Sequence, residues 1–328
     1  MKRRSFTTGL LGLMAAGALG RTKLAKAQSQ PLPALITLVV PFAPGGGADQ
    51  LAREFAHFAQ THAPGTTFVV ENKPGANGAI AARHVARQKP DGTTLLLGTS
   101  STHVLGPLIA KTTAAEITKE FSPVTLLATT ANVLAVASSS RWKTLDEFLA
   151  DARQQALTYG TFGTGSSAHL YGLLLAQSTG AKLSHVPYKG SGQAVTDLLG
   201  SHIDAVFLTS SALESLAREG KVRVLGVTGE TRTRVFPDTR TFEEQQVRQL
   251  DFSGWFGLFG PAGTPAPICD GIAALAANLG KDDNARQRMI GQGYDWVGSS
   301  PAALRTAVEN TIAIYQKVLA TAPGNLAG

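Results

Sequence analysis

The sequence predicts an α/β protein of two lobes with a ligand cleft between them. Short apolar runs rich in β-branched residues alternate with helical patterns along most of the chain, as in parallel sheets covered by helices. Two further apolar stretches, at 121–137 and 252–259, are interpreted as crossings from one lobe to the other and back. At 328 residues the chain is long for one domain and comfortable for two.

The first lobe is predicted from strand, loop and helix units that follow one another closely. Strands are expected at 36–40, 67–71 and 94–98, and each leads through a turn-rich loop into a helical pattern. The run at 94–98 is apolar throughout, which indicates a strand buried on both faces of a parallel sheet.

The second lobe repeats the same plan. Thr144 and Glu147 form a capping-box pattern that opens a helix to about Gln155. Later strands are expected at 157–162, 183–186, 203–208 and 222–227. After the return strand at 252–259, helices are expected from about Pro265, Asp283 and Pro301.

These elements predict a discontinuous first lobe. We expect residues 28–128 and 254–328 to form the first lobe, and residues 129–253 to form the second. Two crossings between two α/β lobes imply a hinge and a cleft that can close around a ligand.

Residues 1–27 have the pattern of an export signal. Lys2, Arg3 and Arg4 precede an apolar core, and the small residues Ala25 and Ala27 frame a cleavage site. The paired arginines fit the twin-arginine route, and a general secretory signal fits the rest equally well. The segment holds six Lys/Arg and no Asp/Glu, so the formal charge of +7 falls to +1 without it.

We therefore expect a soluble periplasmic protein that binds no nucleic acid. A charge near zero gives no electrostatic reason to bind nucleic acid or an anionic membrane. Cys269 is the single cysteine, so no internal disulfide can form, and no cysteine near the cleavage site could carry a lipid anchor.

The glycine loop at 45–47 is the strongest candidate for an anion site. Glycine allows positive φ and close approach of backbone N–H groups, and the helix that follows adds unpaired donors and the positive end of its dipole. The loop lacks the Lys-Ser/Thr ending of a nucleotide-binding P-loop. Asp49 lies in the first helical turn and is interpreted as structural, so the loop is predicted to receive a small carboxylate.

Two other loops present similar groups. Four hydroxyl residues at 99–102 follow a strand, more than one N-cap requires. The loop at 163–168 formally matches a dinucleotide fingerprint, but no Asp or Glu occurs between Asp151 and Asp197, so we expect an anion-binding loop and no cofactor.

Several other residues can be interpreted either as ordinary structural residues or as part of the ligand site. Lys189 is interpreted either as a cationic partner of a carboxylate or as a solvated loop lysine. Phe42 and Trp255 are expected to wall the site, with a core role as the alternative. His169 and His185 are interpreted as helix-surface or loop residues, with an approach to the cleft as the alternative. None of the seven histidines has metal-ligand spacing.

An enzyme is the weaker hypothesis. No Gly-x-Ser-x-Gly motif occurs, and no nucleophile is paired with a base. A hydrolase that uses Ser100 or Ser166 stays as a remote alternative.

Six motifs stand out along the chain: VVPFAPGGG at 39–47, VENKPGA at 70–76, PDGTTLLLGTS at 90–100, GTGSSAH at 163–169, VPYKG at 186–190 and GLFGPAGTP at 257–265. Together they resemble the Bug family of extracytoplasmic substrate-binding proteins of tripartite tricarboxylate transporters. The similarity runs in order along essentially the whole chain after residue 27. It implies a two-lobed periplasmic-binding-protein fold, type II-like, that closes on a small carboxylate held by backbone amides, hydroxyls and water, usually without an arginine.

The resemblance, joined to the loop interpretation, defines the expected ligand-binding residues. They are Phe42, Ala43, Gly46, Gly47, Ala48, Ser100, Ser101, Thr102, Gly163, Thr164, Ser166, Ser167, Tyr188, Thr209 and Trp255. Ala48 replaces a hydroxyl residue that often follows the glycines, and Thr209 replaces an acidic or amide residue, so the specific ligand is not inherited from any relative. The implied partners are a small carboxylate and the permease subunits of a transporter, with the receptor a monomer. A carboxylate sensor that docks on a signalling partner is the alternative.

Overall fold

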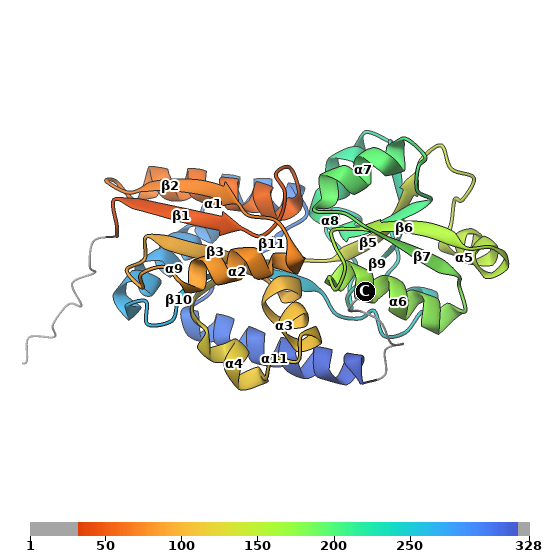
Figure 1. Ribbon diagram of the computed structural model, residues 1–328. Helices are drawn as coiled ribbons and strands as arrows, with labels where there is room; N and C mark the ends of the chain where they lie inside the picture. Colours follow the sequence, from red (N-terminus) through yellow and green to blue (C-terminus); the bar gives the residue numbers. More distant parts are fainter. Residues whose placement is uncertain (1–31, 321–328) are drawn as a thin grey trace, which may run out of the picture.

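The computed structural model describes residues 32–320. The predicted export signal at 1–27 lies outside this range. Figure 1 shows two α/β lobes side by side, each with helices packed against its own sheet. The predicted fold class is confirmed.

The first sheet has six strands in the order β11-β4-β10-β3-β1-β2. Its strands are β1 (Leu35–Val40), β2 (Thr67–Asn72), β3 (Thr94–Thr99), β4 (Phe121–Thr130), β10 (Gly254–Pro261) and β11 (Asp295–Trp296). β1, β2 and β3 are parallel, whereas β10 is antiparallel to both β3 and β4. The chain therefore returns to this sheet after leaving it, as the apolar stretch at 252–259 predicted.

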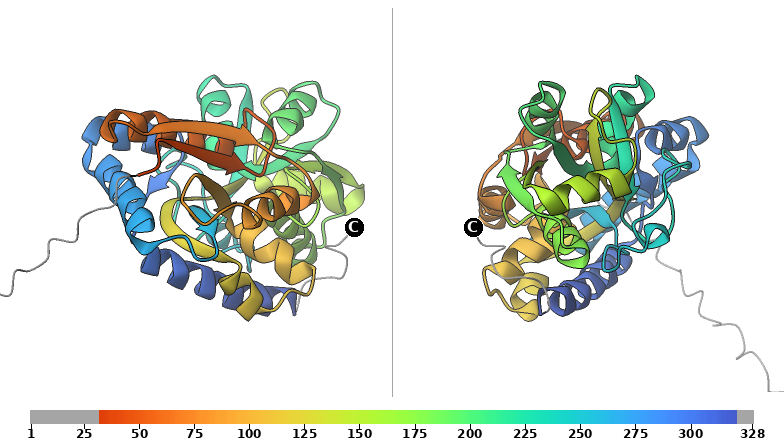
Figure 2. Two further views of the ribbon diagram at one scale, coloured as in Figure 1. Left: turned by 60° about the vertical axis from the view of Figure 1, so that its left-hand side comes forward. Right: turned by 90° about the vertical axis from the view of Figure 1, so that its right-hand side faces the viewer.

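Helices from both ends of the chain cover the first sheet. They are α1 (Gly47–His62), η1 (Ala76–Gly78), α2 (Ala79–Ala86), the π-helical turn η2 (Ser100–Leu105), α3 (Gly106–Ile109), α4 (Ala114–Lys119), α9 (Ala266–Lys281), α10 (Asp283–Gly291) and α11 (Pro301–Leu319). The starts predicted near 265, 283 and 301 are confirmed. In Figures 1 and 2, α11 (dark blue) runs along the base of this lobe, where it packs on β4 and η2.

The second sheet has five strands in the order β7-β6-β8-β5-β9. Its strands are β5 (Asn132–Ala137), β6 (Leu157–Thr161), β7 (Leu183–Pro187), β8 (Ala205–Thr209) and β9 (Val222–Val227). Its helices are α5 (Leu145–Gln154), α6 (Ser167–Thr179), α7 (Ser191–Leu199), α8 (Ser210–Arg218) and η3 (Glu243–Gln245). β6 is parallel to β7 and β8, which places the starts of α6, α7 and α8 at one end of the sheet.

Ala131 is the single residue between β4 of the first sheet and β5 of the second. This abrupt change of sheet confirms the first predicted crossing, and β10 is the second. The domain boundaries predicted at 128/129 and 253/254 stay a prediction; the first lies two to three residues before Ala131, and the second coincides with the start of β10.

The predicted capping box at α5 is only half formed. Thr144 accepts a hydrogen bond from the Glu147 N–H (3.2 Å), but the Glu147 carboxylate accepts from the N–H of Lys143 (2.6 Å) and not from that of Thr144. The helix still begins where the pattern placed it.

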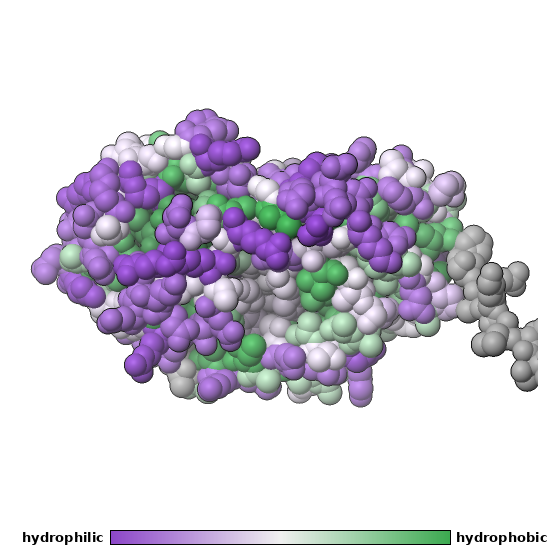
Figure 3. Space-filling model, turned by 180° about the vertical axis from the view of Figure 1, so that it is seen from behind, coloured by the Kyte–Doolittle hydropathy of each residue, from purple (hydrophilic) through white to green (hydrophobic). Residues whose placement is uncertain are grey.

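The surface seen from behind is mainly hydrophilic, with apolar residues in small scattered patches (Figure 3). Cys269 is buried in α9, and burial raises the pKa of its thiol to about 11, so it is an unreactive core residue. None of the described helices combines the length and apolar character that crossing a membrane requires.

Candidate ligand-binding site

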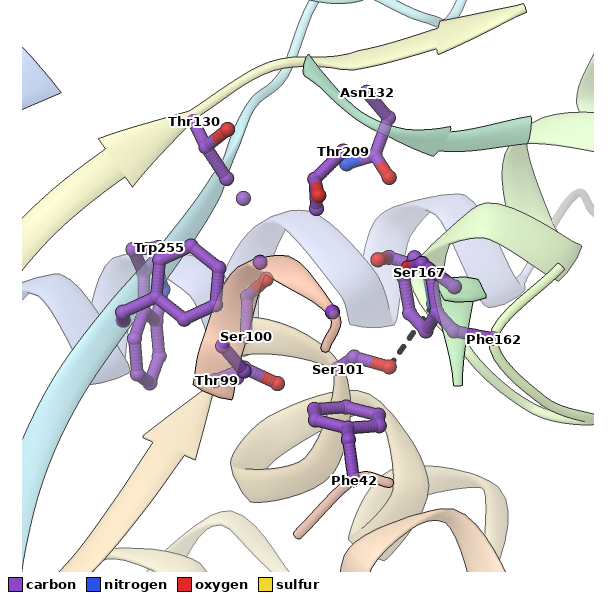
Figure 4. Close-up of a pocket in the computed structure, with 16 residues that line it drawn as sticks. Phe42, Thr99, Ser100, Ser101, Thr130, Asn132, Phe162, Ser167, Thr209 and Trp255 are labelled. Carbon is purple, nitrogen blue, oxygen red and sulfur yellow. Dashed lines mark hydrogen bonds between the residues drawn. The ribbon is translucent and has the colours of Figure 1, made fainter. Parts of the chain in front are cut away.

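A pocket lies between the two lobes and receives residues from both sheets (Figure 4). It encloses about 470 Å³ of empty space, its mouth included. It is lined by Phe42, Gly46, Gly47, Ala48, Thr99, Ser100, Ser101, Thr130, Asn132, Phe162, Ser167, Ser191, Thr209, Gly254, Trp255 and Phe256. None of these described lining residues carries a charged side chain.

The glycine loop brings the start of α1 to this pocket. Gly45 has φ +87°, which glycine adopts without strain, and Gly46 is the N-cap residue without a side-chain cap. As the first two residues of the helix, Gly47 and Ala48 have N–H groups with no intrahelical acceptor, and none of the described residues accepts from them. Two donors at the positive end of a helix dipole therefore face the pocket.

Asp49 shapes this loop and takes no place in the pocket lining. Its buried carboxylate accepts hydrogen bonds from the Gly45 N–H (3.0 Å), from Arg53 (2.9 and 3.0 Å) and from the side-chain amide of Asn72 (3.0 Å). Burial by itself would raise the pKa of Asp49, but these bonds, that from Arg53 foremost, outweigh burial and leave the pKa below its ordinary value. The structural interpretation of Asp49 agrees with these contacts.

The hydroxyl run at 99–102 divides into two pairs. Thr99 and Thr102 hold each other in a capping box at the start of η2, with the Thr102 N–H donating to Thr99 Oγ1 (3.0 Å) and the Thr99 N–H to Thr102 Oγ1 (3.2 Å). Thr99, Ser100 and Ser101 line the pocket, and Thr102 does not. The sequence indicated more hydroxyls than capping requires, and the structure shows that the hydroxyls of Ser100 and Ser101 are not used in the cap.

Two of the first three N–H groups of α6 have acceptors within the protein. Ser166 is the N-cap and accepts from the His169 N–H (3.2 Å), while the Ser167 N–H donates to Ser101 Oγ of the other lobe (3.1 Å, dashed in Figure 4). Of this loop's expected residues, Ser167 lines the pocket and Ser166 does not.

A second groove lies beside the pocket and shares Phe42 and Phe162 with it. Gly163, Thr164 and Tyr188 of the expected ligand set line this groove and not the pocket. Lys189, whose role was left open, lines the groove as well. Tyr188 donates its hydroxyl to Asp197 (2.6 Å).

Phe42 and Phe162 meet edge to face across the lobes, with ring centroids 5.7 Å apart. Ala43 takes part in the same contact between lobes and not in the pocket, since its N–H donates to the Lys189 carbonyl (3.3 Å). A further bond joins Asn77 Nδ2 to the Gly165 carbonyl (2.7 Å), so the lobes touch on several sides of the pocket.

The interpretation of His169 and His185 as surface or loop residues was wrong. The two rings stack in parallel with centroids 3.8 Å apart, His169 being buried and His185 half-buried. Burial lowers the pKa of His169 to about 4, and burial together with the neighbouring His169 lowers the pKa of His185 to about 3. The neutral His169 ring accepts from the Gly165 N–H (3.2 Å) and so supports the loop before α6.

Seven lining residues were not expected from the sequence: Thr99, Thr130, Asn132, Phe162, Ser191, Gly254 and Phe256. Thr130 and Asn132 flank Ala131, where the chain changes sheets, so a crossing strand end was the signal that could have found them. Asn132 is also the one polar residue in the buried strand Asn132–Ala137.

Comparisons with known proteins agree with this geometry. The family model described as "Tripartite tricarboxylate transporter family receptor" matches residues 51–310. Protein BugT of Bordetella pertussis is 33% identical over 236 residues, which cover 71% of this chain and 72% of BugT.

Two solved structures are similar along nearly their whole length. Rpa4515 of R. palustris with adipate is 32% identical with a TM-score of 0.83, covering 88% of this chain and 96% of that one. MatC from Rhodopseudomonas palustris with bound malate is 30% identical with a TM-score of 0.79, covering 87% and 98%.

Proposed function

This chain belongs to the tripartite tricarboxylate transporter receptor family, and on that premise we propose that it captures a small organic carboxylate between its lobes and delivers it to a membrane transporter. The proteins of this family are receptors and not enzymes. The relatives that hold adipate and malate support a carboxylate as the class of ligand.

The observation that carries the proposal is the open start of α1. The N–H groups of Gly47 and Ala48 face a pocket whose described lining has no charged side chain. A carboxylate placed there would accept both N–H groups and neutralise the positive end of the helix dipole. An unpaired cation would find no anionic partner there.

A ligand in this pocket would contact residues of both lobes and so favour closure of the lobes around it. Gly46, Gly47 and Ala48 come from the first lobe, whereas Ser167, Ser191 and Thr209 come from the helix starts of the second. A ligand that contacts both groups favours the closed arrangement over an open one, because only the closed arrangement offers both sets of contacts.

We further propose that the protein acts in the periplasm as a monomer and docks on transporter subunits in its closed, ligand-bound form. The export signal predicted at 1–27 and the periplasmic relatives support this location. The ligand residues proposed here are those of the expected set that line the pocket: Phe42, Gly46, Gly47, Ala48, Ser100, Ser101, Ser167, Thr209 and Trp255.

The test is a thermal-shift screen of the purified protein against mono-, di- and tricarboxylates, amino acids and the neutral carboxamide of each acid. A ligand at about a thousand times its Kd adds roughly 4 kcal/mol to the free energy of unfolding, a shift that is easily measured. We expect acids to stabilise the protein and their carboxamides to have little effect. Stabilisation by carboxamides or cations alone would contradict the proposal.

Delivery is tested separately in cells. Deleting the gene should abolish uptake of the carboxylate that the screen identifies. Unchanged uptake with intact binding would instead indicate a sensor that uses the same pocket.

A further inference from the structure

Asn132 has an unsatisfied side chain inside the pocket. The residue is 1% exposed, and its Oδ1 atom is buried without a hydrogen-bond partner. Its backbone is fixed, because its N–H donates to Thr228 Oγ1 (2.9 Å) and its carbonyl accepts from the Thr228 N–H (2.9 Å). Figure 4 shows the amide pointing into the pocket. Buried amides in native proteins are almost always satisfied, so this one is arranged for a partner from outside the chain.

The space beside this amide is kept open by a glycine. A methyl group on Gly254 would lie 3.6 Å from Asn132 Nδ2 and 3.5 Å from Ser100 Oγ. Ser100 therefore faces the same space from the first lobe. The amide of Asn132 and the hydroxyl of Ser100 thus border one polar corner of the pocket.

The open N–H donors around the pocket are sufficient to bind one carboxylate. Gly47 and Ala48 at the start of α1 keep their N–H groups open, and Ser191 at the start of α7 lies next to Gly46, its N atom 3.7 Å from a Cβ placed on that glycine. The first N–H groups of α6 and α8 are already used, by Ser101 Oγ and by the Ala131 carbonyl. No described lining residue supplies a cation for a second carboxylate or an anion for an ammonium group.

Aromatic side chains form the remaining walls. Trp255 and Phe162 lie on opposite sides of the pocket in Figure 4, and Phe42 lies below. The Trp255 Nε1–H donates to Thr311 Oγ1 (2.8 Å), so it is satisfied outside the pocket. These walls suit an apolar body.

We propose that Asn132 selects the ligand, which is a monocarboxylate whose apolar body carries a neutral hydroxyl group. This proposal rests on the proposed function. The carboxylate lies at the start of α1, the body lies between Trp255 and Phe162, and the hydroxyl meets Asn132, donating to Oδ1 and accepting from Nδ2.

A hydroxyl is the group that satisfies both halves of the amide. A second carboxylate could accept from Nδ2 but would leave Oδ1 without a donor, beside a like charge and without a cation. A ligand that ends in a methyl group would leave both halves unpaired. Sites built around a hydrogen bond reject analogues that lack it far more strongly than apolar pockets reject a missing methylene.

The experiment measures the Kd of the purified protein for two matched series by calorimetry. One series is 4-hydroxybenzoate, 3-hydroxybenzoate, benzoate and terephthalate, and the other is 6-hydroxyhexanoate, hexanoate and adipate. In the series that fits the pocket, we expect a hydroxy acid to bind at least about tenfold more tightly than either the plain acid or the diacid.

Asn132→Leu keeps the volume and removes the amide. It should reduce the hydroxyl preference to less than about threefold while the plain acid still binds. Asn278→Leu, on the exposed face of α9, is the matched control and should keep the wild-type preference.

The outcomes separate the two proposals. If carboxylates bind but a diacid or plain acid binds as tightly as the hydroxy acids, the role of Asn132 is wrong and the receptor function stands. If the folded Asn132→Leu protein keeps the wild-type preference for hydroxy acids, the role of Asn132 is likewise wrong and the receptor function stands. If no carboxylate of any kind binds the wild-type protein, both proposals fail.

Discussion

The starts of α1 and α6 look alike in the sequence and are used differently in the structure. Each helix follows a parallel strand and a glycine-containing loop, and the first residue of each helix lines the pocket. At α1 the N-cap is Gly46, which has no side chain, and Asp49 holds the loop from behind. At α6, Ser166 caps one N–H group and Ser101 of the opposite lobe accepts another.

The difference shows that a glycine loop before a helix does not by itself define a ligand site. What matters is whether the chain supplies its own acceptors for the free N–H groups. The start of α1 is left open for a ligand, whereas the start of α6 joins the two lobes. Substitutions at the start of α1 should therefore change the affinity for the ligand, whereas substitutions at the start of α6 should change the stability of the protein or the closure of its lobes.

The largest effect is expected from Gly47→Ala. A methyl group there would run into Ser211 Oγ and lie 3.0 Å from Thr209 Oγ1, so the lobes could not close as they do here. Overpacking of this kind typically corresponds to a roughly tenfold to hundredfold loss of affinity. Gly192→Ala is the matched control, because Gly192 lies in the first turn of α7, does not line the pocket, and a methyl group there would meet nothing within 4 Å. Calorimetric affinities that fell equally for both variants would contradict this explanation.

Asp49→Ala should have the next largest effect, on the stability of the α1 side. It leaves the Gly45 N–H, Arg53 and Asn72 without their common acceptor. We expect the free energy of unfolding to fall by about 2 kcal/mol, as measured by urea denaturation. Because the pKa of folded Asp49 is lowered, this contribution is complete above pH 3.8 and is lost as the pH falls through the folded pKa. A variant as stable as the wild-type protein at pH 7 would show that Asp49 does not hold the loop.

Acid should weaken the α6 side. His169 and His185 have pKa values lowered to about 4 and about 3 in the folded protein, so between pH 6.5 and these values the unfolded chain binds more protons. Stability must therefore fall as the pH falls through this range, by about 1 kcal/mol per histidine between pH 6.5 and 5.5. Urea denaturation at several pH values measures this slope. His185→Gln removes one of the two titrating rings and should flatten it.

Ser166→Ala should have the smallest effect. Loss of an N-cap typically lowers the free energy of unfolding by about 1 kcal/mol, and the Ser166 hydroxyl does not line the pocket. We expect a lower melting temperature with a Kd within about threefold of the wild-type value. A Kd raised a hundredfold with an unchanged melting temperature would show that α6 binds the ligand as α1 does.

The fold could be predicted from the sequence because its signals are local. Apolar runs such as 94–98 and turn chemistry such as the Ser300–Pro301 pair fix each element, and the two crossings follow from runs that no helix separates. The glycine loop and Trp255 could also be placed at the pocket from the loop pattern and the family resemblance.

The rest of the site depends on which groups the fold satisfies internally. Thr102 and Ser101 are adjacent hydroxyl residues, yet one closes a turn and the other faces the pocket. Asn132 directly precedes the apolar run 133–137 in the sequence, and only the packing of both lobes leaves its Oδ1 atom without a partner. His169 and His185 are 16 positions apart, and their rings stack because α6, which carries His169, packs against β7, which carries His185.

The most direct measurement compares the binding of one carboxylate to the wild-type protein and to Ala48→Pro. Proline at the second position of α1 removes the Ala48 N–H, puts its ring in the place of that hydrogen and does not interrupt the helix, and α9 already carries Pro267 at its own second position. Asp146→Pro, at the second position of α5 far from the pocket, is the control. With the tightest acid from the thermal-shift screen, we expect calorimetry to give an affinity at least about tenfold weaker for Ala48→Pro and unchanged for Asp146→Pro. Equal affinities for wild type and a folded Ala48→Pro would show that the start of α1 does not hold the carboxylate.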